Sequence, residues 1–121
     1  MIILGIDPGI AIVGWGIVDY RGTKFFPVAY GSITTPKEMT TQQRLAEIHR
    51  QLTDIIQKYH PEEVAVEELF FNTNQTTGIR VAEARGVILL TCHQCGLPIA
   101  EYTPLQVKQS VVGYGRAEKS R

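Results

Sequence analysis

The sequence predicts an α/β protein: a mixed five-stranded sheet with helices on both faces. Two observations support this prediction. The N-terminal part carries three apolar segments rich in β-branched residues and separated by turn residues, and the remainder alternates between helical and strand patterns. A meander followed by alternating helices and strands gives such a sheet. The chain has 121 residues and no internal repeat or low-complexity linker, so we expect one domain over 1–121.

The N-terminal meander is expected over residues 2–7, 10–20 and 24–34. The first strand is the apolar run IILGI, which ends at Asp7 before a Pro-Gly pair. A turn around Gly22 joins the second and third strands, and short links of this kind favour antiparallel neighbours.

Helices and strands alternate in the rest of the chain. Apolar residues recur at steps of three and four up to Tyr59, which is typical of an amphipathic helix with one buried face. We expect this helix over 38–59, a strand from about 63, a helix from 75 to about 92, a strand over 97–103 and a helix from 104.

Composition excludes a membrane-spanning helix and says little about partners. No stretch has the apolar length that a bilayer requires, and no signal peptide is visible, so we expect a cytoplasmic protein. Twelve acidic and twelve basic residues cancel. Bases outnumber acids between 105 and 121, which suits an edge that faces phosphates, although a solvated tail shows the same pattern.

Two cysteines flank a histidine in the stretch CHQC. A structural zinc site needs four ligands, and no second pair of ligands accompanies Cys92 and Cys95. We therefore expect reduced thiols near a helix end.

Two carboxylates, Asp7 and Glu67, close apolar strands. In a sheet of this order the first and fourth strands run side by side and parallel, so both acids project from neighbouring carboxyl ends. Strand alternation places Glu67 on the opposite face of the sheet from Val66. The rival acid Glu68 then falls on the same face as Val66. Two adjacent carboxylates repel unless a cation lies between them, which favours Mg²⁺ or Mn²⁺. The alternative is two unrelated, solvated acids, with Asp7 capping its own turn.

Residues 70–86 carry two further features. Phe70 and the aromatic after it either pack in the core or stack on an unpaired base. Gly78, Ala82 and Gly86 fall on every fourth position, and such a ridge lets a sheet or a second helix approach closely.

Four separated stretches, GIDPGIAIVGWGIVD, VAVEELFFNTNQTT, ARGVILL and YTPLQVKQSVVGYGRAEKSR, resemble the RuvC family of bacterial Holliday-junction resolvases, and the resemblance runs from residue 1 to 121. It implies a ribonuclease-H-like fold and a dimeric endonuclease that nicks four-way DNA junctions symmetrically in homologous recombination and repair. It also implies two divalent metal ions, Mg²⁺ or Mn²⁺, and a branch-migration helicase complex as a partner.

The resemblance implies roles for particular residues. Asp7 and Glu67 stand where the family has catalytic, metal-binding acids, and Phe70 stands where an aromatic residue helps to open the junction centre. Lys108 and Lys119 match basic positions that contact DNA, although sequence physics alone reads them equally well as solvated lysines. The implied reaction is phosphodiester hydrolysis by activated water, with two ions about 4 Å apart stabilising the attacking and leaving oxygens.

The resemblance also makes the helix at about 75–90 the dimer-forming helix. The sequence departs from the family at its end, because family members continue into a C-terminal helix with two further metal-binding acids. Glu118 lies too early to replace them. We therefore expect a C-terminally truncated nuclease domain with weak or absent cleavage and residual junction binding.

Two other functions compete with this one. The sugar-kinase, actin and chaperone ATPases share the fold, and their first phosphate loop also follows an apolar strand and an aspartate. Gly9, Gly14 and Gly16 would then approach ATP phosphates, but such ATPases need two domains and 121 residues hold one. The remaining alternative is a non-catalytic DNA-binding module.

Overall fold

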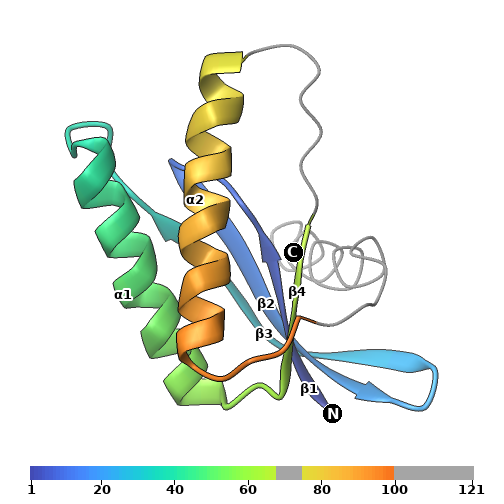
Figure 1. Cartoon of the computed structure of the whole chain (residues 1–121). Helices are drawn as coiled ribbons and strands as arrows, with labels where there is room; N and C mark the ends of the chain where they lie inside the picture. The colour runs from blue at the N-terminus through green and yellow to red at the C-terminus, as the bar shows by residue number, and fades with distance from the viewer. Residues whose placement is uncertain (68–74, 100–121) are drawn as a thin grey trace.

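The computed structural model describes residues 1–67 and 75–99, with the side chains of 75–77 left aside. Two helices lie side by side across one face of a four-stranded sheet (Figure 1). In chain order the elements are β1 (Ile2–Asp7), β2 (Ile12–Arg21), β3 (Lys24–Thr34), α1 (Thr41–Tyr59), β4 (Glu63–Val66) and α2 (Gln75–Gln94).

The sheet is mixed, and its strand order is β3-β2-β1-β4. β1 pairs antiparallel with β2, and β2 pairs antiparallel with β3, so the predicted meander is confirmed. β1 pairs in parallel with β4, which confirms the arrangement that the two acids required. The predicted bounds of β3 are also confirmed, and β2 begins two residues later than expected, at Ile12.

The predicted five-stranded sheet needs correction, because the described residues form four strands. The expected fifth strand, 97–103, is represented by a single parallel bridge between Ile99 and Val64, at the outer edge of β4. The rest of that segment and the helix expected from 104 lie outside the described residues. Both described helices cover the same face, so the expectation of helices on both faces stays a prediction.

Helix α1 begins three residues later than predicted because Thr40 caps it. The Thr40 hydroxyl accepts a hydrogen bond from the Gln43 backbone N–H, and the Gln43 side chain accepts one from the Thr40 N–H, which is a complete capping box. His60 ends the helix in the left-handed conformation, with φ 51°, and Pro61 follows. Local side-chain chemistry therefore sets both ends of α1.

The core lies between the helices and one face of the sheet. Alternate strand residues point toward the helices, and the apolar side of each helix meets them. The buried members are Leu4, Ile6, Val13, Ile17, Ile33, Ile48, Leu52, Ile56, Val64, Val66, Ala84, Ile88 and Cys92. Within the described part of the chain, no helix is long and apolar enough to cross a membrane.

Candidate active site

Asp7 and Glu67 lie side by side at the carboxyl ends of two parallel strands. The register pairs Ile6 of β1 with Val66 of β4. The Glu67 N–H donates to the Ile6 carbonyl oxygen at 3.1 Å, so the parallel ladder continues one step beyond β4. The next residues along the two strands are the two acids, which are therefore neighbours across about one strand spacing of 4.8 Å.

Both acids face away from the helices. Ile6 and Val66 belong to the core that α1 and α2 cover. Successive strand residues alternate between faces, so Asp7 and Glu67 point to the opposite face. Asp7 is exposed and Glu67 is half-buried. The sequence-based prediction that these two acids meet is consistent with this register.

The chain around Asp7 leaves its side chain room on the sheet. The partner of Asp7 on β2 is Gly14. A Cβ atom built on Gly14 would lie 3.5 Å from the Asp7 Cβ, at an ordinary contact distance. After Asp7 the backbone turns sharply through residues 8–11. A Cβ on Gly9 would lie 2.1 Å from the Ile12 carbonyl oxygen, so only glycine fits this turn.

Arg85 is a residue near the site that the sequence did not single out. Its Nε–H on α2 donates to the backbone carbonyl oxygen of Glu67 at 3.3 Å. This bond ties the end of β4 to α2. No feature of the sequence around Arg85 marks this contact, which joins residues eighteen positions apart.

The donor set fits a hard divalent cation. Two carboxylates from adjacent strand ends supply only oxygen ligands, which Mg²⁺ and Mn²⁺ prefer, and a cation between them relieves their repulsion. Among residues 1–67 and 75–99 no group of three or more His, Cys, Asp or Glu gathers as a metal site. Asp7 and Glu67 are therefore the two candidate ligands in the described part of the chain.

The other residues predicted for the site lie outside the described residues. These are Phe70, Lys108 and Lys119, together with the rival acid Glu68. Their predicted roles remain predictions.

The cysteines lie at the far end of α2. Both are free thiols, Cys92 buried and Cys95 partly buried. Burial raises the pKa of the Cys92 thiol to about 12, and the neighbouring Cys95 adds to the rise. A thiol with this pKa stays protonated at neutral pH and is a poor nucleophile.

The described fold, an antiparallel meander joined to a parallel strand that brings two acids together, is ribonuclease-H-like. Residues 3–121 match the family described as Crossover junction endodeoxyribonuclease RuvC. This chain belongs to the RuvC family.

Individual relatives agree. The chain is 60% identical over 121 residues to Crossover junction endodeoxyribonuclease RuvC of Alkaliphilus metalliredigens and 55% identical to that of Clostridioides difficile. The whole chain aligns in both cases and spans 74% and 72% of those proteins. The solved structure of T. thermophilus RuvC in complex with Holliday junction substrate is 33% identical, with a TM-score of 0.78 over 90% of this chain and 70% of that one. The ATPase alternative is not favoured by these matches.

Proposed function

We propose that this chain is a structure-selective endonuclease that resolves four-way DNA junctions by metal-dependent phosphodiester hydrolysis, in homologous recombination and repair. The observation that carries the proposal is the pair of acids, Asp7 and Glu67, on one face at adjacent strand ends. Family membership supports the same substrate, and so does the Thermus relative, whose structure was solved in complex with Holliday junction substrate.

In this proposal Asp7 and Glu67 hold the catalytic metal. Bound Mg²⁺ or Mn²⁺, as two ions in the complete site, supplies positive charge for the attacking water and the leaving oxygen of an in-line displacement. Gly14 keeps the sheet beside Asp7 free of a side chain, and Arg85 holds the backbone of Glu67.

Substrate contacts are assigned to three residues by family resemblance. Phe70 stacks on a base at the junction centre, since aromatic faces bind bases with little sequence preference. Lys108 and Lys119 bind phosphates and so set the position of the DNA without reading its sequence.

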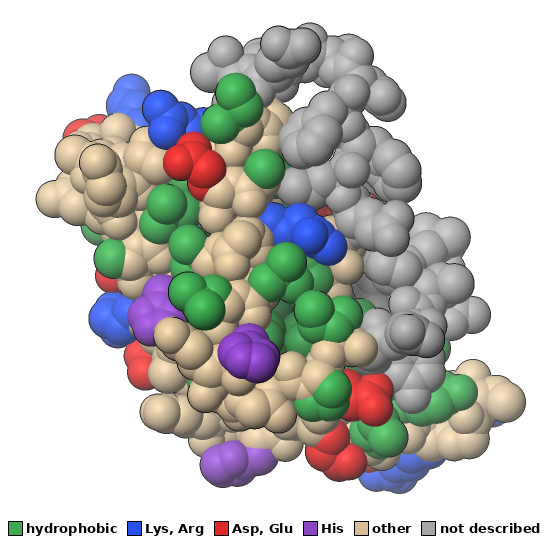
Figure 2. Space-filling view, in the orientation of Figure 1, with side chains coloured by type: hydrophobic (Ala, Val, Ile, Leu, Met, Phe, Trp, Pro, Cys, Tyr) green, Lys and Arg blue, Asp and Glu red, His purple; other side chains and the backbone are tan. Residues whose placement is uncertain are grey.

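We also propose that the protein works as a homodimer formed through α2. The outward side of α2 carries the ridge of Gly78, Ala82 and Gly86 and continues to Leu90, which is 53% exposed. Among the described residues, no atom beyond the chain neighbours and the helix's own backbone lies within 4 Å of a Cβ built on Gly86. Figure 2 shows hydrophobic side chains gathered on the face that carries α2. A second α2 packed on this ridge would place two active sites on one junction, as symmetric nicking requires.

The remaining expectations complete the proposal. Residues 1–121 form a single nuclease domain, and the two further metal-binding acids that the family resemblance implies are expected from a C-terminal helix. The protein acts in the cytoplasm with a branch-migration helicase complex.

A junction-cleavage assay tests the central claim. A labelled four-way junction and a matched linear duplex are incubated with protein and Mg²⁺ at fixed salt. The variants Asp7→Asn and Glu67→Gln are compared with Asp19→Asn, an acid of the same sheet that pairs with Arg21 and the N-terminus at the opposite end. Both the 121-residue chain and a chain extended to the length of its relatives are assayed.

We expect selective binding of the junction by both chains and cleavage chiefly by the extended one. Losing one metal ligand should lower cleavage by at least about 100-fold, whereas Asp19→Asn should cleave normally. Equal binding of both DNAs, or full cleavage by Asp7→Asn, would contradict the proposal.

Metal binding is measured separately from activity. Mn²⁺ is added to ¹⁵N-labelled protein, and we expect paramagnetic broadening of the amides of Asp7 and Glu67 before those of the β2–β3 turn. Broadening that is as strong in Asp7→Asn would place the metal elsewhere.

A further inference from the structure

Two polar side chains of the described residues are buried, and they do different things. Thr91 is fully buried inside α2, where its hydroxyl donates to the Val87 carbonyl oxygen one turn earlier, at 2.7 Å. Thr35 is only 3% exposed and follows directly after β3. Ile12 pairs with Thr34, so the contacts of Thr35 continue the β2–β3 ladder to residues just beyond Asp7.

Thr35 holds the loop that leaves the acid. Its backbone N–H donates to the Ala11 carbonyl oxygen at 3.0 Å, and its hydroxyl donates to the Ile10 carbonyl oxygen at 2.7 Å. Both carbonyls belong to loop 8–11, the segment between Asp7 and the start of β2. One residue therefore satisfies two consecutive backbone acceptors of this loop.

Two further contacts constrain this loop. At Gly9 a Cβ atom would lie 2.1 Å from the Ile12 carbonyl oxygen, so the backbone already folds closely on itself. The residue after Thr35 is anchored in turn, because Arg44 of α1 donates its Nε–H to the Pro36 carbonyl oxygen at 3.2 Å. A chain of contacts thus runs from α1 through residues 35–36 to loop 8–11.

We propose that Thr35 is a positioning residue for phosphodiester cleavage, and that its two hydrogen bonds to loop 8–11 hold Asp7 in register with Glu67. The proposal rests on the function proposed above. Pairing with Gly14 on β2 fixes the backbone of Asp7 itself. Loop 8–11 fixes the backbone that directly follows Asp7. A misplacement of about 1 Å in a reacting geometry can cost about 100-fold in rate, so a modest loosening of this loop is measurable.

Two substitutions separate the hydroxyl from the rest of the residue. Thr35→Val keeps the shape and the N–H bond to Ala11 but removes the donor to Ile10. Thr35→Ser keeps that donor and loses a methyl group. We expect single-turnover cleavage of saturating junction to fall about 10-fold or more in Thr35→Val, with junction affinity within about twofold of wild type, and we expect Thr35→Ser to restore most of the rate.

The matched control is Thr91→Val, the same chemical change at the other buried threonine, away from the acids. It should destabilise the fold to a similar degree, since its hydroxyl also contacts His49 Nδ1 at 2.8 Å, and it should leave cleavage unchanged. A second readout is amide exchange of residue 35 and of residues 9–12, which should quicken in Thr35→Val alone. The concentration of Mn²⁺ that half-broadens the Asp7 amide should rise in the same variant.

The outcomes are distinct. If the wild-type protein cleaves the junction and Thr35→Val cleaves it at the same rate, the positioning role is overturned and the proposed function stays intact. A fall that Thr91→Val matches, or that Thr35→Ser shares, reduces Thr35 to a structural residue and also overturns it. Absence of cleavage in every chain, the extended one included, overturns the proposed function, and the positioning role falls with it.

Discussion

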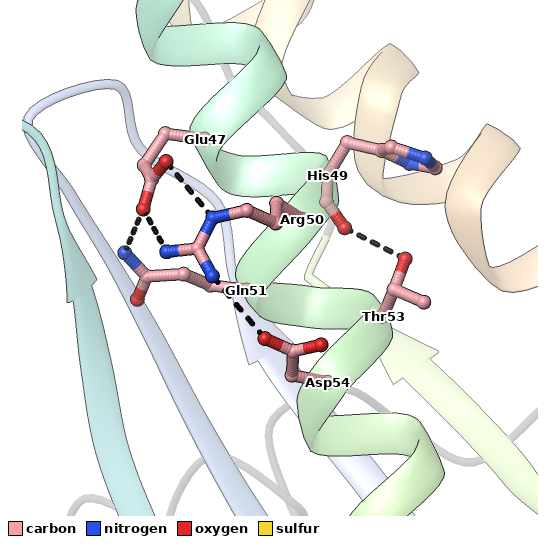
Figure 3. A network of polar contacts seen from close by, with 6 residues as sticks. All are labelled: Glu47, His49, Arg50, Gln51, Thr53 and Asp54. Carbon is pink, nitrogen blue, oxygen red and sulfur yellow. Dashed lines mark hydrogen bonds and ion pairs between the residues drawn. The ribbon is translucent and has the colours of Figure 1, made fainter.

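The outward faces of α1 and α2 differ in kind, although both helices cover the same face of the sheet. The outer face of α1 carries charges that pair with one another (Figure 3). Arg50 binds Glu47, one turn before it, and Asp54, one turn after it at 3.3 Å; the Gln51 amide also donates to Glu47, at 2.7 Å. The charged groups of this face bind one another and water, so the face needs no partner molecule.

The outer face of α2 is largely apolar beyond its first turns. An ion pair between Arg80 and Glu83, at 3.2 Å, decorates its N-terminal part. The exposed hydrophobic residues Ile79 and Leu90 are 60% and 53% exposed, and the small residues Ala82 and Gly86 lie between them. Exposed apolar side chains on this face are what the proposed dimer contact would cover.

The difference teaches that helical periodicity alone does not distinguish a charged, internally paired outer face from an apolar one, and we propose that the apolar one is the dimer contact. Both helices bury one side against the sheet. The composition of the other side differs between the helices, and the predictions below test whether this difference separates a solvent face from the proposed dimer contact.

The largest effects on stability should come from the buried faces of α1 and α2, which both pack on the sheet. Leu52 of α1 and Ile88 of α2 are fully buried in one core. Leu52→Ala and Ile88→Ala should each lower the free energy of unfolding by about 2–5 kcal/mol, because each leaves a cavity. Urea denaturation measures this. A loss below about 1 kcal/mol at either site would show that its helix packs loosely on the sheet.

The next effect separates the two outer faces. Leu90→Glu places a charge in the proposed dimer contact and should weaken self-association about 100-fold, as expected for a central apolar contact. Gln57→Glu adds the same charge to the exposed outer side of α1 and should change nothing. Sedimentation equilibrium reports both. Equal weakening in the two variants would mean that charge alone, and not the α2 face, governs association.

Gly86→Ala should act in opposite directions on folding and on association. The added methyl group meets no atom of the described residues outside its own helix backbone, so it should stabilise the helix by up to about 1 kcal/mol. The same methyl group would widen a close helix-helix approach and weaken the dimer. Thermal unfolding at low concentration and sedimentation at high concentration measure the two effects. Stabilisation with unchanged association would remove Gly86 from the interface.

The smallest effect concerns the charged network on α1. Its hydrogen bonds from Arg50 and Gln51 lower the pKa of Glu47 to about 2, from 4.5. A carboxyl group with a depressed folded-state pKa stabilises the fold above its unfolded pKa and loses that contribution as pH falls from about 4.5 to about 2. Glu47→Gln should flatten this part of the stability profile, with little effect at neutral pH in high salt, because the pair is exposed.

Urea midpoints measured from near-neutral pH down into the acid range check this. Asp54→Asn is the control, since Asp54 contacts the same arginine from a more exposed position. An unchanged profile in Glu47→Gln would show that other carboxylates set the acid sensitivity.

Much of the fold and half of the candidate site could be predicted from the sequence. The bounds of β3 and the place of Glu67 opposite Val66 depend on local alternation, which is visible in the letters. The parallel pairing of β1 and β4 followed from the element order, because a helical crossover between strands of one sheet favours it. The strand expected over 97–103 shows the limit: among its described residues only Ile99 bridges to Val64, because an apolar run does not by itself say how much of a ladder forms.

The contacts that support the acids could not be predicted. Arg85 reaches the backbone of Glu67 from eighteen residues away, and Thr35 reaches Ile10 from twenty-five. Nothing in the sequence around Thr35 marks it as buried or as a donor to a loop that precedes it by two strands.

By itself the sequence determined the periodicity of each element, the capped start of α1 and the two acids at strand ends, because these depend on residues within a few positions of one another. Only the tertiary structure decided that both helices share one face, that the ridge of α2 points outward and that Thr35 clamps the loop after Asp7. Those features depend on which surfaces meet when the chain closes on itself, and the free energy of that closure is distributed over contacts between distant residues.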